Sequence, residues 1–248
     1  MKRHPYSNLQ FPAVHSYPFV AINMVSSIDG KVTSSGTLKP GSLGSIFDRH
    51  TMNVIRSHFD AVICGGNTIR QHPYYLGVPK EYEMEREGKG LPSQPLTVIL
   101  TNSGHLDFDT PLFHNPPYPP IILTSEKGAA ALPKKVEQLS EIEICGSNKV
   151  ILEKALETLY TKYSIRHLLL EGGPSVNYLF LQKKAVNEIF LTLAPRLVGL
   201  KSDLTMVMGN RVLFPEPSIS LVSYFEYNNE LFLRYRLTYS PEKHYGRN

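Results

Sequence analysis

Cysteine is scarce in this chain: only Cys64 and Cys145 occur among 248 residues, and each lies within an apolar run. Two cysteines cannot build the framework of a disulfide-rich secreted protein, and they cannot supply a cysteine-rich metal site. A single α/β domain of 248 residues can bury a full hydrophobic core without such cross-links. The scarcity therefore indicates an ordinary globular protein with reduced thiols.

Long apolar runs are missing as well. No stretch approaches the roughly 18–20 apolar residues that a membrane-spanning helix needs. Residues 1–6 carry charge but are not followed by an apolar stretch of signal-peptide length. We therefore expect a soluble, cytoplasmic protein without a membrane partner.

The chain also lacks a large excess of charge of one sign. Lys plus Arg number 26 and Asp plus Glu number 22, which gives a formal net charge of +4. This balance does not favour nucleic acid as a partner, but it suits a small anionic ligand. The metal-binding and nucleophile motifs H-E-x-x-H, C-x-x-C and G-x-S-x-G are absent, and so is the H-x-E of zinc deaminases. We expect no metal.

Short apolar runs alternate with helical patterns through most of the chain. Continuous apolar runs of this length are typical of strands that helices cover on both faces. We expect strands over residues 19–25, 61–64, 96–100, 120–123, 142–145 and 167–170. We expect helices over residues 48–58, 149–163 and 175–184. The alternation predicts a three-layer α/β fold with a mostly parallel central sheet.

The C-terminal part has a different pattern. Residues 218–227 and 230–239 are β-rich and flank Asn228-Asn229, and asparagine tolerates the positive φ of a tight turn. They predict an antiparallel hairpin at one edge of the sheet. Residues 80–95 and 107–120 are expected to be surface excursions. We therefore predict one domain over residues 1–248, with its core at about 17–240.

Two of the expected strands end at glycine pairs, Gly65-Gly66 and Gly172-Gly173. Glycine lets a phosphate approach the backbone, and a following helix N-terminus offers free N–H groups. Ligands of open α/β sheets lie beyond the carboxyl ends of the strands, so two such junctions could hold one extended phosphorylated ligand. A glycine pair after a strand is also a common turn, and neither junction is a standard Rossmann or P-loop motif. These residues alone indicate no more than a nucleotide-binding α/β enzyme.

Residues 23–31, with the sequence NMVSSIDGK, place polar side chains at the end of a buried strand. Such side chains either face a ligand or build a turn around Asp29-Gly30, and both interpretations stay open.

Five motifs in order resemble the pyrimidine reductases of riboflavin biosynthesis, the reductase half of the bifunctional deaminase-reductase and its stand-alone relatives. They are residues 23–31, 43–49 (LGSIFDR), 60–70 (DAVICGGNTIR), 170–175 (LEGGPS) and 188–199 (EIFLTLAPRLVG). The resemblance runs from about Phe19 to Tyr239, nearly the whole chain. The deaminase half is absent, in agreement with the missing zinc motif.

The resemblance implies a dihydrofolate-reductase-like fold, a homodimer and NADPH as hydride donor. The reaction it implies converts a ribosylamino-pyrimidine 5′-phosphate to its ribitylamino form. By position, the cofactor would contact Ser26, Gly65, Gly66, Thr68, Asn102, Gly172, Gly173, Pro174, Ser175 and Val176. The substrate would contact Asn23, Arg56, Arg70 and Glu171.

The reaction needs an acid as the ribosyl ring opens, and Asp29 and Glu171 are the candidate catalytic residues. Glu171 could equally bind sugar hydroxyls. Arg56 and Arg70 are candidates for the substrate phosphate, since a guanidinium forks onto phosphate oxygens. Lys31 is better interpreted as a solvated surface charge.

Two segments depart from the family pattern. The sequence Thr68-Ile69-Arg70-Gln71-His72-Pro73 lacks the Asp-Asp-Pro that many members have, and Leu38-Lys39-Pro40 replaces a Ser-x-Trp segment. These changes leave open whether the base carries a 2-amino or a 2-oxo group, and the choice between NADPH and NADH is open as well. A reductase of the same fold for a pterin or folate, and a nucleotide-binding module without catalysis, are the alternatives.

Overall fold

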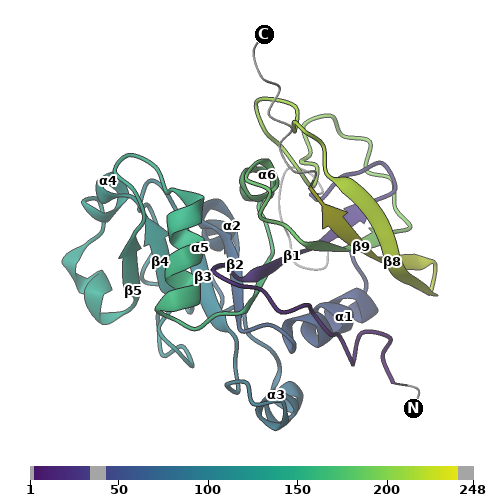
Figure 1. Cartoon of the computed structure of the whole chain (residues 1–248), viewed down its shortest axis with the longest axis horizontal. Coiled ribbons are helices and arrows are strands. Elements are labelled where there is room, and N and C mark those ends of the chain that lie inside the picture. The colour runs from purple at the N-terminus through teal and green to yellow at the C-terminus, as the bar shows by residue number, and fades with distance from the viewer. Residues whose placement is uncertain (1–2, 34–42, 240–248) are drawn as a thin grey trace.

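A computed structural model describes residues 3–33 and 43–239, so Leu38-Lys39-Pro40 lies outside the described residues. Within them, nine strands form one sheet in the order β5-β4-β3-β2-β6-β1-β7-β9-β8 (Figure 1). The strands are β1 (Phe19–Ser27), β2 (Ala61–Gly65), β3 (Leu96–Leu100), β4 (Ile121–Thr124), β5 (Glu141–Ile144), β6 (His167–Leu170), β7 (Glu188–Ala194), β8 (Ser218–Tyr227) and β9 (Glu230–Thr238).

The sheet is parallel from β5 through β7, and β9 and β8 complete it in antiparallel pairings. The predicted α/β fold with a mostly parallel sheet and a C-terminal antiparallel hairpin is therefore confirmed. Strand β7 was not among the strands expected from the apolar runs.

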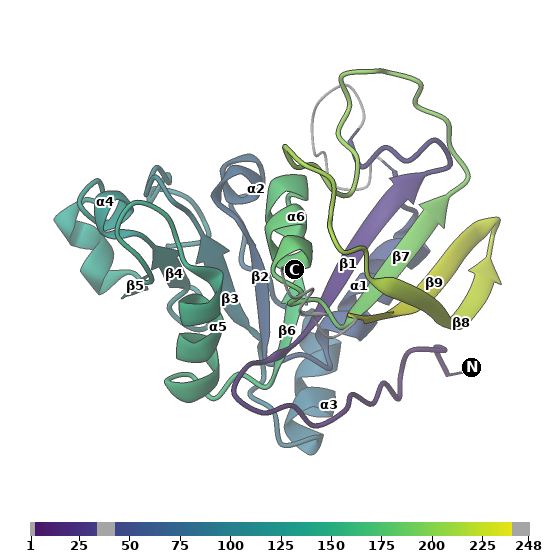
Figure 2. The same ribbon diagram turned by 45° about the horizontal axis from the view of Figure 1, so that its top comes forward.

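Helices cover both faces of the parallel part of the sheet. They are α1 (Ile46–Arg56), α2 (Gly66–Gln71), α3 (Glu83–Gly88), α4 (Glu126–Ala129), α5 (Leu152–Thr161) and α6 (Pro174–Gln182), with short 3-10 turns at Lys80–Tyr82 and Lys134–Gln138. Helices α5 and α6 lie in front of the sheet in Figure 2, α1 lies behind it, and α3 lies below the strands. The result is three layers, as continuous apolar strands require.

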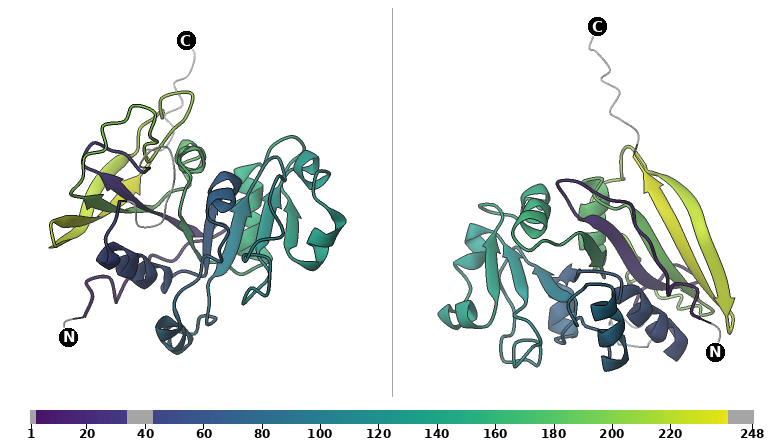
Figure 3. Two further views of the ribbon diagram at one scale, coloured as in Figure 1. Left: turned by 180° about the vertical axis from the view of Figure 1, so that it is seen from behind. Right: turned by 60° about the horizontal axis from the view of Figure 1, so that its bottom comes forward.

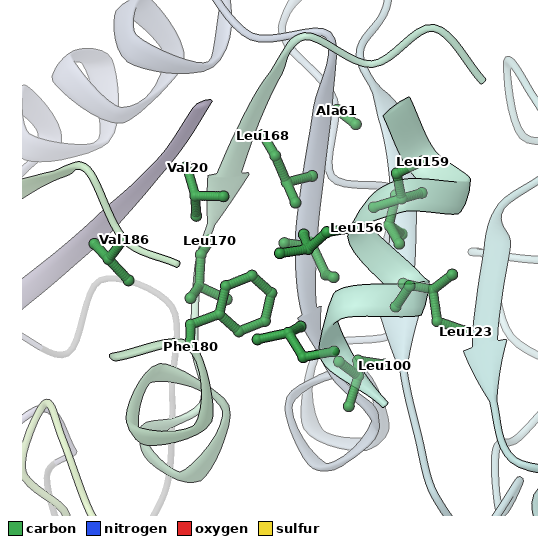
Figure 4. Close-up of a cluster of buried hydrophobic side chains, with 14 of the residues drawn as sticks. Val20, Ala61, Leu100, Leu123, Leu156, Leu159, Leu168, Leu170, Phe180 and Val186 are labelled. Atoms are coloured by element: carbon green, nitrogen blue, oxygen red, sulfur yellow. The ribbon is translucent and has the colours of Figure 1, made fainter. Parts of the chain in front are cut away.

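The core between the sheet and α5 and α6 consists mainly of aliphatic side chains, with Phe180 as its fully buried aromatic ring. Leu156 and Leu159 of α5 and Phe180 of α6 pack on Val20, Leu168 and Leu170 of the strands (Figure 4). On the opposite face, α1 contributes Val54 and Ile55 to a second cluster with Phe19 and Phe190. Because side chains alternate along a strand, odd and even positions of β1 serve different clusters.

The two segments expected as surface excursions enter the core. Residues 80–95 contain α3 and bury Tyr82 and Arg86, and residues 107–120 bury Phe108, Leu112 and Phe113. Most of the remaining residues of both segments are exposed or half-buried, in agreement with the expected surface excursions, and these few buried side chains anchor each segment to the core.

The hairpin turns at Asn228 and Asn229, which adopt φ of 50° and 65°. This is the left-handed pair that a tight two-residue turn requires. Strand β8 forms the edge of the sheet and is exposed along nearly its whole length (Figure 3). It nevertheless carries large apolar side chains, which are Ile219, Leu221, Val222, Tyr224 and Tyr227.

Among the described residues, none of the helices has both the length and the apolar character that crossing a lipid bilayer demands.

Candidate active site

Strands β2, β6 and β1 are neighbours in the sheet, so their carboxyl ends meet at one edge. Each end is followed by a segment singled out in the sequence: Gly65-Gly66 after β2, residues 171–173 after β6 and residues 28–31 after β1. The two glycine junctions are in direct contact, because the Gly65 N–H donates a hydrogen bond of 2.9 Å to the Gly172 carbonyl.

The glycines are needed for this close approach. A Cβ on Gly65 would lie 2.8 Å from Cγ2 of Val176, and a Cβ on Gly173 would lie 3.2 Å from Oγ1 of Thr68. Gly172 adopts a φ of +83°, which side chains rarely tolerate. The two junctions therefore form one surface of bare backbone.

The helices that follow these junctions have free N-termini. Helix α6 starts after Gly173 and α2 after Gly65, and no side chain caps either helix by a hydrogen bond. Serine hydroxyls cap α1 and α4, whereas α3 and α5, like α2 and α6, have no side-chain cap. An uncapped N-terminus offers N–H groups and a partial positive charge to an anion. The junctions therefore fit a cofactor diphosphate, which would lie against backbone where a side chain would intrude.

The predicted contacts at the end of β1 divide between the two faces of the sheet. Ser26 lies on the same face as Met24, whose sulfur lies 3.4 Å from where a Cβ on Gly172 would be. The Ser26 hydroxyl donates to the Ser27 carbonyl at 2.9 Å. Asn23 is half-buried and has the opposite parity, so it points to the face of α1. Ser26 thus lies on the same face of the sheet as the glycine junctions, whereas Asn23 lies on the face covered by α1.

Glu171 and Arg56 are brought together on that second face. The Arg56 guanidinium donates to both carboxylate oxygens of Glu171, at 2.8 and 2.5 Å, and to the Gly77 carbonyl at 2.8 Å. The Arg56 and Glu171 side chains are only 11% and 12% exposed. These three hydrogen bonds fix the Arg56 guanidinium beside Glu171, and the expected contact of Arg56 with the substrate stays a prediction. Glu171, held in an ion pair, is a hydrogen-bond acceptor.

Asp29 has a structural task. Its carboxylate accepts hydrogen bonds from the Ser27 hydroxyl and from the backbone N–H groups of Val198 and Gly199. These bonds, led by that of Ser27, lower the pKa of Asp29 to about 2. The exposed carboxylate thereby fastens the segment after β7 to the end of β1, and its expected catalytic role stays a prediction.

Arg70 lies on the β3 side of the junctions, away from Glu171. Its guanidinium donates to the His105 carbonyl at 2.6 Å and to the Asn67 side chain. Asn102 is on the same side, and its Oδ1 accepts the Val150 N–H at 2.7 Å. Arg70 therefore lies beside the loop that carries Asn102, and its expected contact with the substrate stays a prediction.

The sequence analysis did not identify Asp48 of α1 as a candidate site residue. Asp48 in the first turn of α1 is half-buried, and Thr192 of β7 supplies a hydrogen bond to its carboxyl group. Burial, followed by the nearby charges of Glu230 and Glu171, raises the pKa of Asp48 to about 6. Two signals were available: the helix-capping spacing Ser45-x-x-Asp48 and the polar Thr192 inside an apolar strand.

A pocket of about 370 Å³ lies elsewhere, among residues of α5, the end of α6 and the segment before β1. Pro18 and Asn187, which directly precede β1 and β7, line it. The pocket is therefore at the amino ends of these strands, opposite the glycine junctions.

The whole arrangement resembles known proteins. The chain is 29% identical to the 2,5-diamino-6-ribosylamino-4(3H)-pyrimidinone 5′-phosphate reductase of Aquifex aeolicus over 196 residues, 77% of this chain and 83% of that protein. The riboflavin biosynthesis protein RibD of Chlamydia pneumoniae is 25% identical over 204 residues, 81% of this chain but 52% of that protein. This chain thus matches about half of the longer RibD relative.

The fold is that of a pyrimidine reductase-like protein from Corynebacterium diphtheriae, with a TM-score of 0.76 at 24% identity over 90% of this chain and 93% of that one. Acinetobacter baumannii RibD shares it with a TM-score of 0.72 at 23% identity, over 90% of this chain and 58% of that one. The model of the RibD C-terminal domain family matches residues 18–233. The chain therefore belongs to the RibD C-terminal domain family.

Proposed function

We propose that this chain is an NADPH-dependent reductase of riboflavin biosynthesis that converts a ribosylamino-pyrimidine 5′-phosphate to its ribitylamino form. The observation that carries the proposal is the meeting of two features at one edge of the sheet. Bare glycine backbone lies on the α6 face, and the carboxyl groups of Asp48 and Glu171 lie on the α1 face. The names of the reductase relatives support the same reaction.

The cofactor would rest on the glycine junctions. Its diphosphate would lie at Gly65-Gly66 and Gly172-Gly173 and the start of α6, at Pro174, Ser175 and Val176, with Ser26 and Thr68 beside them. When bound, NADPH supplies a hydride to C1′ of the opened ribosylamine. Arg70 next to the loop of Asn102 favours the additional phosphate of NADPH over NADH, because a guanidinium near the adenosine ribose attracts it.

Asp48 is the residue we propose as proton donor. Opening of the ribosyl ring requires a proton on the ring oxygen, and a donor works best when its pKa lies near the operating pH. The pKa of Asp48, about 6, meets this condition, and the pKa of Asp29, about 2, does not. Glu171, oriented by Arg56, and Asn23 would bind the sugar hydroxyls or the base.

We further propose that the base carries a 2-amino group, so that reduction precedes deamination. Three relatives that this chain matches over most of their length are named as reductases of the diamino compound. The reaction is expected in the cytoplasm, where the buried thiols of Cys64 and Cys145 stay reduced.

The exposed edge strand supports the proposal of a homodimer. Strand β8 presents Leu221, Tyr224 and other large apolar side chains to solvent, next to backbone groups at the sheet edge. A second copy related by a two-fold axis presents the same strand in the opposite direction, which matches antiparallel pairing or face-to-face packing.

The test is to follow NADPH oxidation with the 2-amino and the 2-oxo phosphoribosylamino-pyrimidines, and with dihydrofolate as the alternative substrate. We expect the 2-amino compound to have the highest kcat/KM, and NADH to be a poorer donor. Turnover of dihydrofolate alone would favour the folate alternative. Binding of NADPH without any turnover would favour a non-catalytic module.

A further inference from the structure

Glu230, the first residue of β9, is unusual for a carboxylate next to a hairpin turn because it is only 3% exposed. Its Oε1 accepts the Ser45 backbone N–H at 2.8 Å, and its Oε2 accepts the Ser45 hydroxyl at 2.5 Å. Glu226, on the other side of the same turn, remains exposed and accepts only a local hydrogen bond from Asn229. Burying a charge is costly, so the position of Glu230 calls for a reason beyond the turn.

Ser45 connects Glu230 to α1. A serine hydroxyl has one proton and two lone pairs, and here the proton goes to Glu230. Its oxygen therefore faces the helix, where it accepts the N–H groups of Phe47 at 3.0 Å and Asp48 at 3.1 Å. Glu230 thus fixes the orientation of the cap, and the cap fixes the backbone of Asp48.

The same carboxylate acts on Asp48 through its charge. The groups that face Asp48 come from four elements: Glu230 from β9, Glu171 from the segment after β6, Thr192 from β7 and Arg49 from α1 itself. Glu230 and Glu171 disfavour a second negative charge at Asp48, whereas Arg49 and the Thr192 hydroxyl favour it. Glu171 is already paired with Arg56, which partly offsets its charge.

We propose that Glu230 is a positioning residue of the reaction: through Ser45 it holds Asp48 in place, and its charge opposes a further negative charge at Asp48. This inference rests on the proposed function, because it assigns Glu230 to the proton donor of that reaction. It also links the C-terminal hairpin to the N-terminus of α1.

The experiment compares Glu230→Gln with the matched control Glu226→Gln in the full chain. Carboxyl carbon NMR measures the titration midpoint of Asp48 in the free protein, with its signal assigned by Asp48→Asn. The pH dependence of kcat/KM, which reports groups of the free enzyme, is measured with NADPH and the 2-amino substrate. We expect Glu230→Gln to lower the Asp48 midpoint by about one pH unit and to move the alkaline limb of kcat/KM down equally, with no change for Glu226→Gln.

Further variants separate position from charge. Glu230→Asp keeps the charge, so the midpoint should return toward the wild-type value. Ser45→Ala keeps Glu230 but removes the connection, so we expect a lower kcat with little change in the midpoint. Ser45→Ala and Glu230→Asp also test the proposal if Glu230→Gln does not fold.

An unchanged Asp48 midpoint in a folded Glu230→Gln, with only the melting temperature lowered, would overturn the proposal. If wild type reduces neither pyrimidine but the midpoint still moves, the reaction assigned to the site fails while the control of Asp48 by Glu230 stands.

Discussion

The Arg56 guanidinium forms a bidentate ion pair with the Glu171 carboxylate, with Nε 2.8 Å from Oε1 and Nη2 2.5 Å from Oε2. The pair joins the last turn of α1 to the segment after β6, two elements 115 residues apart in sequence. It fixes where the Glu171 oxygens point and leaves their remaining lone pairs for a ligand.

Replacing Glu171 by Gln should therefore affect both stability and turnover. The substitution leaves the nearly buried Arg56 without its counter-charge, and we expect a loss of about 2–4 kcal/mol in the free energy of unfolding. We expect kcat to fall by about 100-fold or more while the Kd for NADPH changes little, because we assign the cofactor to the glycine junctions. Urea unfolding, single-turnover rates and fluorescence titration check these three quantities. A near-normal kcat would remove Glu171 from the site.

A bulky residue at Gly173 should abolish cofactor binding. A Cβ there already lies 3.2 Å from Oγ1 of Thr68, so Gly173→Val would place methyl groups against the surface that we assign to the diphosphate. We expect the Kd for NADPH to rise by about 100-fold or more, equivalent to about 2.7 kcal/mol. Gly88→Val is the matched control, because a Cβ at Gly88 meets nothing within 4 Å. Calorimetric titration measures the Kd for NADPH of both variants. An unchanged Kd in Gly173→Val would contradict the assignment of the diphosphate to this surface.

The raised pKa of Asp48, about 6, predicts a pH-dependent rate. If Asp48 acts as the acid, only its protonated form is active, and kcat/KM should decrease as the pH rises through about 6. Asp48→Asn should lower kcat/KM by about 100-fold or more and abolish that decrease. A pH series of kcat/KM for both proteins measures the effect. A decrease near pH 6 that persists in Asp48→Asn would assign the titration to another group.

The lowered pKa of His58 predicts that the protein loses stability in acid. Burial, followed by the charge of Lys89, lowers the pKa of His58 from 6.5 to about 4. Between these two values the unfolded chain binds a proton that the folded chain does not, so stability is full above pH 6.5 and declines as the pH falls toward 4. Urea unfolding at several pH values should show a shallower decline for His58→Gln than for wild type. His114→Gln, at an exposed histidine, serves as the control.

The apolar edge strand predicts that a charge on β8 separates the dimer. Tyr224 is 67% exposed in the single chain, and its burial between two copies would be disrupted by Tyr224→Glu. Light scattering after size exclusion should give twice the chain mass for wild type and the chain mass for the variant. Ser220→Glu, a charge at an exposed serine of the same strand, is the matched control. A monomeric wild type would refute the dimer.

Local signals in the sequence predicted much of the fold. The apolar runs of β2 and β6, the Asn228-Asn229 turn and the glycine junctions depend on neighbouring residues, so they could be identified without the structure. Partners across the sheet could not. The sequence around Arg56 does not show that its guanidinium pairs with Glu171, and the sequence around Ser45 does not indicate a contact with Glu230. Each partner lies far along the chain, in the segment after β6 and in β9. Alternation along β1 separated Asn23 from Ser26, which the linear motif had grouped together.

Strand β1 lies between β6 and β7, which are made only after residue 167 of the chain. During synthesis, β1 leaves the ribosome before both of its neighbours and cannot pair with them until they have emerged. Its apolar residues are accessible to chaperones and prone to aggregation in that interval. Folding that depends on such distant pairings is slow. Truncated chains that end before β7 should therefore be recognised as unfinished by the cell's quality-control proteases and should not persist as partially active fragments.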